Sequence, residues 1–401
     1  MASSPFSQVP LAPKDPILGI TEQYQADPRP DKVNLGVGVY YDEAGKLPLL
    51  KAVRLAEEAL AARQVPYGYL PIDGIGQYNK SVQSMLFGAD SPLIAEGRML
   101  TVQSLGGTGA LRIGADLLKR FLGDKPVYIS DPSWENHRAL FEAAGFAVHQ
   151  YRYYDPASRG VDFPGMLQSL KDAPQGSIVV LHACCHNPTG VDISASQWDE
   201  VLDVMVQRGQ LPFMDIAYQG FGDGIDADAL AVRKFAASPL PVLVASSFSK
   251  SFSLYGERVG GLSMALPSQD EAQRVLSQLK RVVRTSYSNP PTHGGAVVSS
   301  ILANPEWRTL WENELAGMRD RIKRMRNELA KRLAAAGVKQ DFGFITRQRG
   351  MFSYTGLTTE QVNRLREEHG VYAIGTGRIC VAALNEKNIG KVAEGIAAVL
   401  R

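Results

Sequence analysis

Short apolar runs alternate with helical segments through the middle of the chain. Runs typical of strands occupy residues 99–104, 126–130, 177–185, 211–217 and 241–247. Between them, segments such as 110–122 and 198–209 place apolar residues three and four positions apart, as one face of a helix requires. Strands that are apolar on both faces and alternate with helices are typical of a mostly parallel sheet covered on both sides. The pattern therefore predicts an α/β fold.

The pattern changes after residue 300. Apolar residues from Trp311 to Leu333 recur at intervals of three or four, and Gly337 supplies a helix stop. One long amphipathic helix is expected here. Its basic residues (319–332) are expected to form a solvated face rather than a basic binding patch. Residues 338–401 alternate short strands and helices, which predicts a second, smaller α+β domain.

The first 30 residues are rich in proline and predict an extended arm with a short helix over residues 15–27. Such an arm is stable only when it lies against something, for example a partner subunit.

Composition excludes several classes of function. The 401 residues carry 43 Lys and Arg against 41 Asp and Glu, a net charge of +2, which argues against a nucleic-acid or anionic-membrane partner. No apolar run approaches the roughly 18 residues of a membrane span, and the first residues lack the features of a secretory signal. Three cysteines, two of them adjacent, cannot form a disulfide framework, so a reducing cytoplasm is the expected compartment.

Five polar clusters follow predicted strands, at the edge where open α/β sheets bind ligands. The first is the glycine-rich segment 106–109, directly before a predicted helix. Glycines allow close backbone approach and a helix N-terminus attracts anions, so the segment predicts a phosphate cradle. A tight turn is the alternative. Arg112 breaks the dinucleotide-binding pattern, and no Gly-Lys-Ser/Thr follows as in a P-loop.

Two further clusters contain an aromatic and an ionisable residue each. Trp134 offers a flat face and His137 a hydrogen bond, although a core tryptophan beside a satisfied histidine is the alternative. Asp215 and Tyr218 end an apolar strand. A carboxylate there is costly without a cationic partner, which we expect to be a protonated ring nitrogen of a bound cofactor. A helix cap or a structural ion pair is the alternative.

The segment 182–190 invites a zinc hypothesis. His182, Cys184, Cys185 and His186 lie within five residues. Adjacent residues on a strand point to opposite faces, so the two thiols are expected to point apart, and no metal is predicted. The Asn187 turn leaves its amide free to donate a hydrogen bond.

The last cluster surrounds Lys250. This lysine follows a buried strand among hydroxyl groups, where partial desolvation and nearby positive charge favour a Schiff-base amine. Ser247, Ser249 and Arg258 add phosphate ligands. The Ser-x-x-Lys pattern of penicillin-binding enzymes also fits Ser247 and Lys250, but neither of its companion motifs, Ser-Asp-Asn and Lys-Thr-Gly, occurs.

Together the clusters describe one ligand, which has a phosphate, a flat heteroaromatic ring, a ring nitrogen, a phenolic oxygen and an aldehyde. Pyridoxal 5′-phosphate has all of these groups. The ordered motifs GGTGALR, DPSWENH, HNPTG, DIAYQG, SFSKSFSLYGERVGG, RTSYSNPP and GRICVA resemble the class I aminotransferases of the aspartate aminotransferase type, over essentially the whole chain. YLPIDG, DPSWENH and RQRGMFSYTGL look closest to the bacterial aromatic-amino-acid (tyrosine) aminotransferases.

The resemblance implies a role for each matching residue. Lys250 would form the Schiff base and then move the substrate proton, Asp215 would keep the ring nitrogen protonated, and His137 would support Asp215. The remaining expected cofactor ligands are Trp134 on the ring, Asn187 and Tyr218 at the ring oxygen, and Gly107, Thr108, Ser247, Ser249, Arg258 and the neighbouring subunit's Tyr69 at the phosphate. One departure is Gly106, where many relatives carry serine.

The resemblance also implies the substrate contacts. Arg378 would bind the α-carboxylate as a bidentate fork, with Trp134 and Asn187 nearby, and Gly38 would contribute from a loop that can close. Arg284 matches an arginine that reaches across a dimer to the distal carboxylate of dicarboxylic substrates. Because burying this guanidinium unpaired beside an aromatic ring is costly, an enzyme that accepts aromatic substrates must swing it away.

The expected function is therefore a pyridoxal-phosphate-dependent, ping-pong aminotransferase that acts as a homodimer. It would use tyrosine, phenylalanine and also aspartate or glutamate, with 2-oxoglutarate as acceptor. The alternatives are an aspartate aminotransferase with little aromatic activity, a cofactor-binding sensor without turnover, and a zinc protein. The same resemblance implies the fold type I architecture. Its expected parts are an arm (1–12), a large cofactor-binding domain (49–319) and a small domain (13–48 and 320–401).

Overall fold

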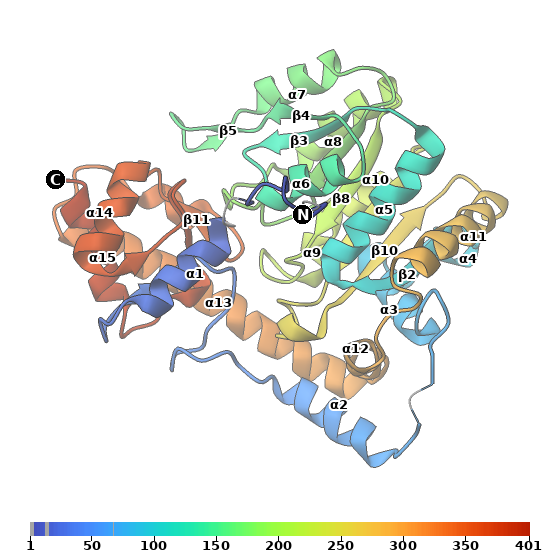
Figure 1. The fold of residues 1–401 in the computed structure, drawn as a ribbon, viewed down its shortest axis with the longest axis horizontal. Helices are drawn as coiled ribbons and strands as arrows, with labels where there is room; N and C mark the ends of the chain where they lie inside the picture. The colour runs from blue at the N-terminus through green and yellow to red at the C-terminus, as the bar shows by residue number, and fades with distance from the viewer. Residues whose placement is uncertain (1–3, 13–15, 67) are drawn as a thin grey trace.

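The computed structural model describes residues 4–12, 16–66 and 68–401. Its centre is a seven-stranded sheet in which β10 alone, among the described strands, runs antiparallel to its neighbours. In spatial order the strands are β2 (Met99–Leu105), β10 (Val259–Ala265), β9 (Val242–Ser247), β8 (Leu211–Ile216), β7 (Ile178–His182), β3 (Val127–Asp131) and β4 (Val148–Arg152). The predicted mostly parallel α/β sheet is confirmed (Figure 1).

Helices cover both faces of this sheet. Phe213 and Leu243 pack into one apolar cluster with α5 (Gly106–Leu122), α6 (Glu135–Ala143) and α11 (Gln269–Ser286). Met214 and Val244, one residue further along, pack into the other cluster with α3 (Gly76–Phe87), α8 (Ala195–Gln207) and α10 (Leu230–Ala236). Successive strand residues face opposite sides, so burial of both explains the unbroken apolar runs.

One helix connects the sheet to the C-terminal part of the chain. Helix α13 (Pro305–Ala335) begins at Asn304, whose side chain accepts hydrogen bonds from the next N–H groups. It carries the predicted apolar face, but the prediction that its basic residues are solvated is wrong in part. Arg321 and Arg326 are 7% and 1% exposed, because their guanidinium groups bind buried carbonyl groups of other segments. The expected domain boundary at residue 320 falls inside α13 and stays a prediction.

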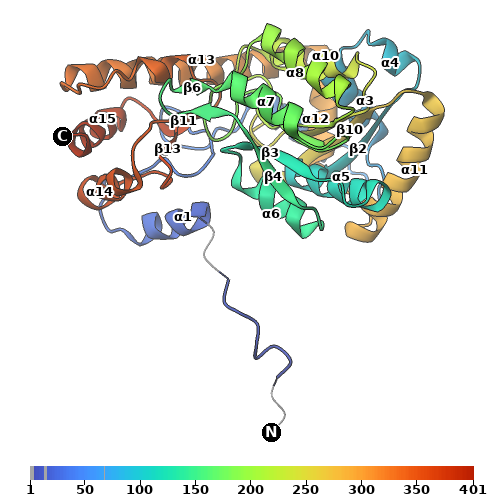
Figure 2. The same ribbon diagram turned by 90° about the horizontal axis from the view of Figure 1, so that it is seen from above.

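The second group of elements lies beside the sheet, at the far end of α13 (Figures 1 and 2). It contains α1 (Pro16–Ala26), α14 (Thr359–His369) and α15 (Ile389–Val399). Two small pairs of strands join them, β1 (Val33–Asn34) with β12 (Val371–Tyr372) and β11 (Phe352–Tyr354) with β13 (Arg378–Cys380). The α+β composition expected for the C-terminal segment is confirmed.

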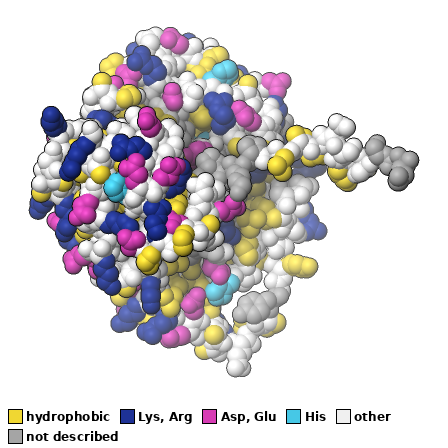
Figure 3. Space-filling view, turned by 60° about the vertical axis from the view of Figure 1, so that its left-hand side comes forward, with side chains coloured by type: hydrophobic (Ala, Val, Ile, Leu, Met, Phe, Trp, Pro, Cys, Tyr) yellow, Lys and Arg dark blue, Asp and Glu magenta, His cyan; other side chains and the backbone are white. Residues whose placement is uncertain are grey.

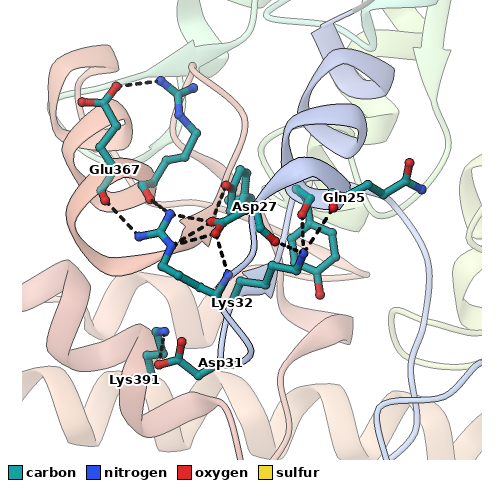
Figure 4. A network of polar contacts seen from close by, with 10 residues as sticks. Gln25, Asp27, Asp31, Lys32, Glu367 and Lys391 are labelled. Carbon is teal, nitrogen blue, oxygen red and sulfur yellow. Dashed lines mark hydrogen bonds and ion pairs between the residues drawn. The ribbon is translucent and has the colours of Figure 1, made fainter.

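A polar network joins the segment that follows α1 to α14 (Figure 4). The Arg29 guanidinium pairs with Asp27 and donates to the carbonyl oxygens of Arg366 and Glu367 at the end of α14, both at 2.9 Å. Tyr372 donates to Asp27 at 2.7 Å. Carbonyl groups in the last turn of a helix often lack partners inside the helix. Arg29 donates to two such groups of α14 and thereby links this helix to the N-terminal segment.

The described part of the arm, residues 4–12, runs away from the body and is exposed (Figure 2). Residues 1–3 of the expected arm and 13–15 lie outside the described residues. Figure 3 shows Lys and Arg mixed with Asp and Glu on the face drawn, as the balanced composition predicts. Among the described helices, none is both long and apolar enough to cross a membrane.

Candidate active site

The structure gathers most of the predicted site residues around one cavity of about 570 Å³. It lies where the parallel strands end and where β11 and β13 approach them. The predicted residues that line it are Gly38, Gly107, Thr108, Trp134, Asn187, Asp215, Tyr218, Ser247, Ser249, Lys250, Arg258 and Arg378. His137 stands directly behind Asp215. Tyr69 and Arg284 are exposed and do not line the cavity.

One end of the cavity is suited to an anion. Helix α5 begins there at Gly106, so its first N–H groups point toward the cavity end. Arg258 donates to Ser249 Oγ at 3.2 Å, and Ser247 donates to the same oxygen at 3.3 Å. The hydroxyl, guanidinium and backbone donors together form the set that binds a phosphate group.

The departure at Gly106 has a structural reason. Its φ is +66°, a conformation that side-chain-bearing residues rarely adopt. A Cβ atom added there would lie 2.5 Å from Nη2 of Arg258. The Arg258 guanidinium therefore occupies the space that a side chain at residue 106 would need.

The floor of the cavity carries the carboxylate of Asp215 at the end of β8. His137 binds it at 2.9 Å through Nε2, and Nδ1 of His137 lies 2.9 Å from Ser133 Oγ. Burial alone would raise the pKa of Asp215, but the hydrogen bond with His137 and the nearby positive groups outweigh it and leave the pKa lowered. Asp215 is therefore an anion, ready to pair with a cationic ring nitrogen.

A histidine that sequence reasoning gave no role in the site lies next to this pair. Neither ring nitrogen of His182 has a hydrogen-bond partner among the described residues, although the ring is buried. Burial and the charge of His137 lower its pKa to about 3, so the ring is neutral at pH 7. His182 stands 5.0 Å from His137 and 4.4 Å from His186, centroid to centroid. It serves as a neutral wall of the cavity.

Lys250 follows β9 and turns its ammonium into the same space. Its Nζ lies 4.8 Å from the ring centroid of Tyr218. Burial lowers the pKa of Lys250 to about 8, with Arg258 adding to the effect and Asp215 opposing it. A substantial fraction of this amine is therefore unprotonated and nucleophilic near neutral pH.

The opposite wall belongs to the second group of elements. Arg378 is 1% exposed and donates to Asn187 Oδ1 at 3.2 Å and to the Gly36 carbonyl at 2.8 Å. Its Nε has no partner among the described residues. A buried guanidinium with an unused donor and no carboxylate is suited to bind the carboxylate of a ligand.

Phe352 is a wall residue that the sequence reasoning did not single out. The Arg378 guanidinium lies 4.4 Å from its ring centroid. A Cβ atom on Gly38 would lie 2.7 Å from Cζ of the same ring, so the loop needs glycine there. Phe352 is part of the quoted motif RQRGMFSYTGL, which was the one available signal.

The expectation that Cys184 and Cys185 point apart is wrong. Both residues lie beyond the end of β7, and Cys185 has a φ of +53°, so the alternation of a strand no longer holds. Their Sγ atoms lie within 4.8 Å of each other and of a carboxylate oxygen of Asp228.

The residues around the cavity fit pyridoxal 5′-phosphate. The anion-binding end, the anionic Asp215 and the nucleophilic Lys250 match its phosphate, ring nitrogen and aldehyde, and the unused Nε of Arg378 leaves a site for a substrate carboxylate.

Comparison with known proteins agrees with this fit. The chain is 62% identical to an aspartate aminotransferase of Pseudomonas aeruginosa, across 98% of this chain and 99% of the relative. It is 50% identical to an aromatic-amino-acid aminotransferase of Escherichia coli, across 98% and 100%. A crystal structure of an aromatic-amino-acid aminotransferase from Burkholderia pseudomallei, covalently bound to pyridoxal phosphate, superposes with a TM-score of 0.98 at 64% identity, across 100% of both chains.

The family described as aminotransferase class I and II matches residues 30–396, nearly the whole chain. The family resemblance drawn from the sequence is confirmed, and with it the pyridoxal-phosphate dependence that this family has. The chain belongs to the class I and II aminotransferases.

Proposed function

We propose that this aminotransferase acts on tyrosine and phenylalanine and also on aspartate and glutamate, with 2-oxoglutarate as the acceptor. One observation carries the proposal: Lys250, Asp215 and the buried Arg378 border one cavity, and His137 binds Asp215 from behind. The named aspartate and aromatic relatives support both classes of substrate.

When bound, pyridoxal phosphate supplies an aldehyde that combines with amines and a protonated ring that accepts the electrons of a broken Cα–H bond. The residues that would hold the phosphate are Arg258, Ser247, Ser249 and Thr108, together with the N–H groups at the start of α5. The Asp215 carboxylate would accept the hydrogen bond of the protonated ring nitrogen.

The other residues act on the ring and on the substrate. Trp134 would pack on the face of the ring, and Asn187 and Tyr218 would donate to its oxygen. Arg378 would bind the α-carboxylate, and the Lys250 amine would move the proton from the substrate Cα. Because one Arg378 serves both substrates, the first product leaves before the second substrate enters.

Two expected residues would come from a second copy of the chain. Tyr69 is 95% exposed. Arg284 is exposed, and within the described part of the chain its guanidinium donates to Ser288 alone. Their exposure supports a homodimer in which Tyr69 reaches the neighbouring phosphate and Arg284 the distal carboxylate. The cytoplasm remains the expected compartment on the sequence argument alone.

The test follows the visible absorbance of the bound cofactor while L-tyrosine or L-aspartate is added in separate cuvettes. Loss of absorbance with both amino acids is expected. Loss with aspartate alone would favour an aspartate aminotransferase, the second candidate that the 62% identical relative supports. No absorbance after addition of pyridoxal phosphate would contradict the proposal.

A substitution separates the two substrate classes. Arg284→Met removes one charge-assisted contact and is expected to lower kcat/KM for aspartate about 10- to 100-fold, with little loss for tyrosine. Arg281→Met, an exposed arginine on the same helix, is the matched control. Equal losses for both substrates would contradict the assignment of Arg284.

A further inference from the structure

Two thiols and a carboxylate meet behind the active site. The Sγ atoms of Cys184 and Cys185 and an oxygen of Asp228 lie within 4.8 Å of one another, and the three residues are at most 7% exposed. We refer to these three residues as the dithiol cluster. It contains none of the residues that would hold the cofactor.

Backbone contacts hold the three side chains in place. The Asp192 carboxylate accepts the N–H groups of Cys185 at 2.7 Å and His186 at 2.8 Å, which fixes the turn that brings the thiols together. Asp228 accepts three backbone N–H groups, those of Gly220, Gly222 and Asp223, at 2.8 to 2.9 Å. The ligand atoms are therefore positioned before anything binds.

The cluster is reached from a second cavity, of about 750 Å³, which Cys184 and Asp228 line. The charged groups that line it are Asp192, Asp223, Asp226, Asp228, Arg347 and Arg349. Asp223 pairs with Arg349 and Asp226 with Arg233, both at 2.6 Å, so Asp192 and Asp228 are the lining carboxylates without an ion pair among the described residues. Asp228 is 4% exposed. A cation would relieve the cost of burying its carboxylate.

We propose that the dithiol cluster is a binding site for one soft divalent cation of the Zn²⁺ or Cd²⁺ class. Thiolate sulfur selects such ions, and a carboxylate oxygen is a common further ligand. The three residues supply three ligands, and the cavity leaves room for a water molecule as the fourth. Zinc bonds of about 2.0–2.3 Å require the ligand atoms to lie closer together than 4.8 Å, so binding would require the thiol side chains to rotate toward Asp228.

Binding involves no oxidation. The cation takes the electron pairs of two sulfur atoms and one carboxylate oxygen, and the two thiol protons pass to solvent. The bound ion would also restrain the active site, because Asn187 lies two residues beyond Cys185.

The test is a titration of the reduced holoenzyme with Cd²⁺ alone, after three free thiols per chain have been counted. Thiolate coordination produces an ultraviolet charge-transfer absorption, and we expect it to saturate at one Cd²⁺ per chain. The other compact group of potential ligands, His137, His182 and Asp215, contains no sulfur and gives no such band.

Cys184→Ser and Cys185→Ser are each expected to weaken Cd²⁺ binding at least tenfold and to reduce the band. Cys380→Ser is the matched control, since this third buried thiol stands apart from the cluster and its Sγ contacts the Val39 carbonyl. Retained cofactor absorbance shows that each variant is folded. A missing band in the unsubstituted protein, or a band that survives both substitutions, overturns the proposal.

A measurement without substitutions covers the case in which a variant fails to fold. Zn²⁺ added to the unsubstituted holoenzyme is expected to slow alkylation of Cys184 by iodoacetamide, read by peptide mass spectrometry, and to leave Cys380 unchanged. Equal alkylation of Cys184 with and without Zn²⁺ contradicts the site.

Discussion

Arg326 is the most consequential buried charge outside the active site. It lies on α13, is 1% exposed, and donates to the carbonyl groups of Gly350 at 2.7 Å and Phe352 at 2.6 Å, and to the Ser353 hydroxyl. Burial lowers its pKa to about 10, so it is still charged at pH 7. It therefore holds the segment that places Phe352 against Arg378.

Replacement by methionine keeps much of the apolar stem and removes the donors. Each hydrogen bond from a charged group contributes about 1.5–3 kcal/mol, and each buried acceptor left without a donor adds a cost. Part of the loss is offset because the guanidinium no longer has to be desolvated. We expect Arg326→Met to lower the free energy of unfolding by about 3–5 kcal/mol, as when one partner of a buried polar network is removed.

The assay is urea unfolding of the holoenzyme, followed by tryptophan fluorescence. Arg324→Met is the matched control, because Arg324 stands two residues away with 59% of its side chain exposed and only a 3.9 Å contact to Glu43. Its loss is expected to cost about 0–1 kcal/mol. Arg326→Lys keeps the charge but loses the planar guanidinium, so its loss of unfolding free energy should lie between those of the other two variants. If Arg326→Met lowers the free energy of unfolding no more than Arg324→Met does, the reasoning is refuted.

Three further predictions concern the cavity. Lys250 has a pKa of about 8 in the folded protein, below its ordinary 10.5. The rate at which pyridoxal phosphate attaches to the cofactor-free protein should therefore rise with pH and level off above about pH 8. A stopped-flow rate that still increases near pH 10 would contradict this pKa. His137→Phe removes the 2.9 Å contact to Asp215, so the carboxylate pKa should rise and kcat should fall about 10-fold or more with KM little changed, and an unchanged pH–rate profile would contradict this. Gly38→Ala places a Cβ 2.7 Å from Phe352 and should raise KM for amino acids several-fold in steady-state assays, whereas an unaltered KM would show that the loop gives way.

Local patterns in the sequence predicted most of the site. Lys250, Asp215 and Gly107 each follow an apolar run, and parallel strands bring their carboxyl ends to one edge, so local patterns were enough to group them. Their roles remain proposals. The sequence could not assign His182 or Phe352, because a buried histidine or phenylalanine is ordinary until its neighbours are known.

Two errors have the same origin. The basic residues of α13 were expected in solvent, because charge usually lies there, yet Arg321 and Arg326 meet carbonyl groups that come from distant segments. Cys184 and Cys185 were expected to point apart, because strand residues alternate, yet the strand had already ended. Both outcomes depend on the folded backbone rather than on residue type. Carbonyl groups from distant segments bury the two arginines, and a turn fixed by Asp192 brings the two thiols together.

The sequence by itself determined the α/β fold, the family and the residue types that the chemistry requires, because apolar periodicity and short motifs are local properties of the chain. The tertiary structure decided which side chains lose water and which remain solvated. That choice lowers the pKa of Lys250 and brings two thiols to Asp228. It also leaves Nε of Arg378 without a partner among the described residues. Burial and charge proximity depend on the whole packed arrangement, so no local pattern contains them.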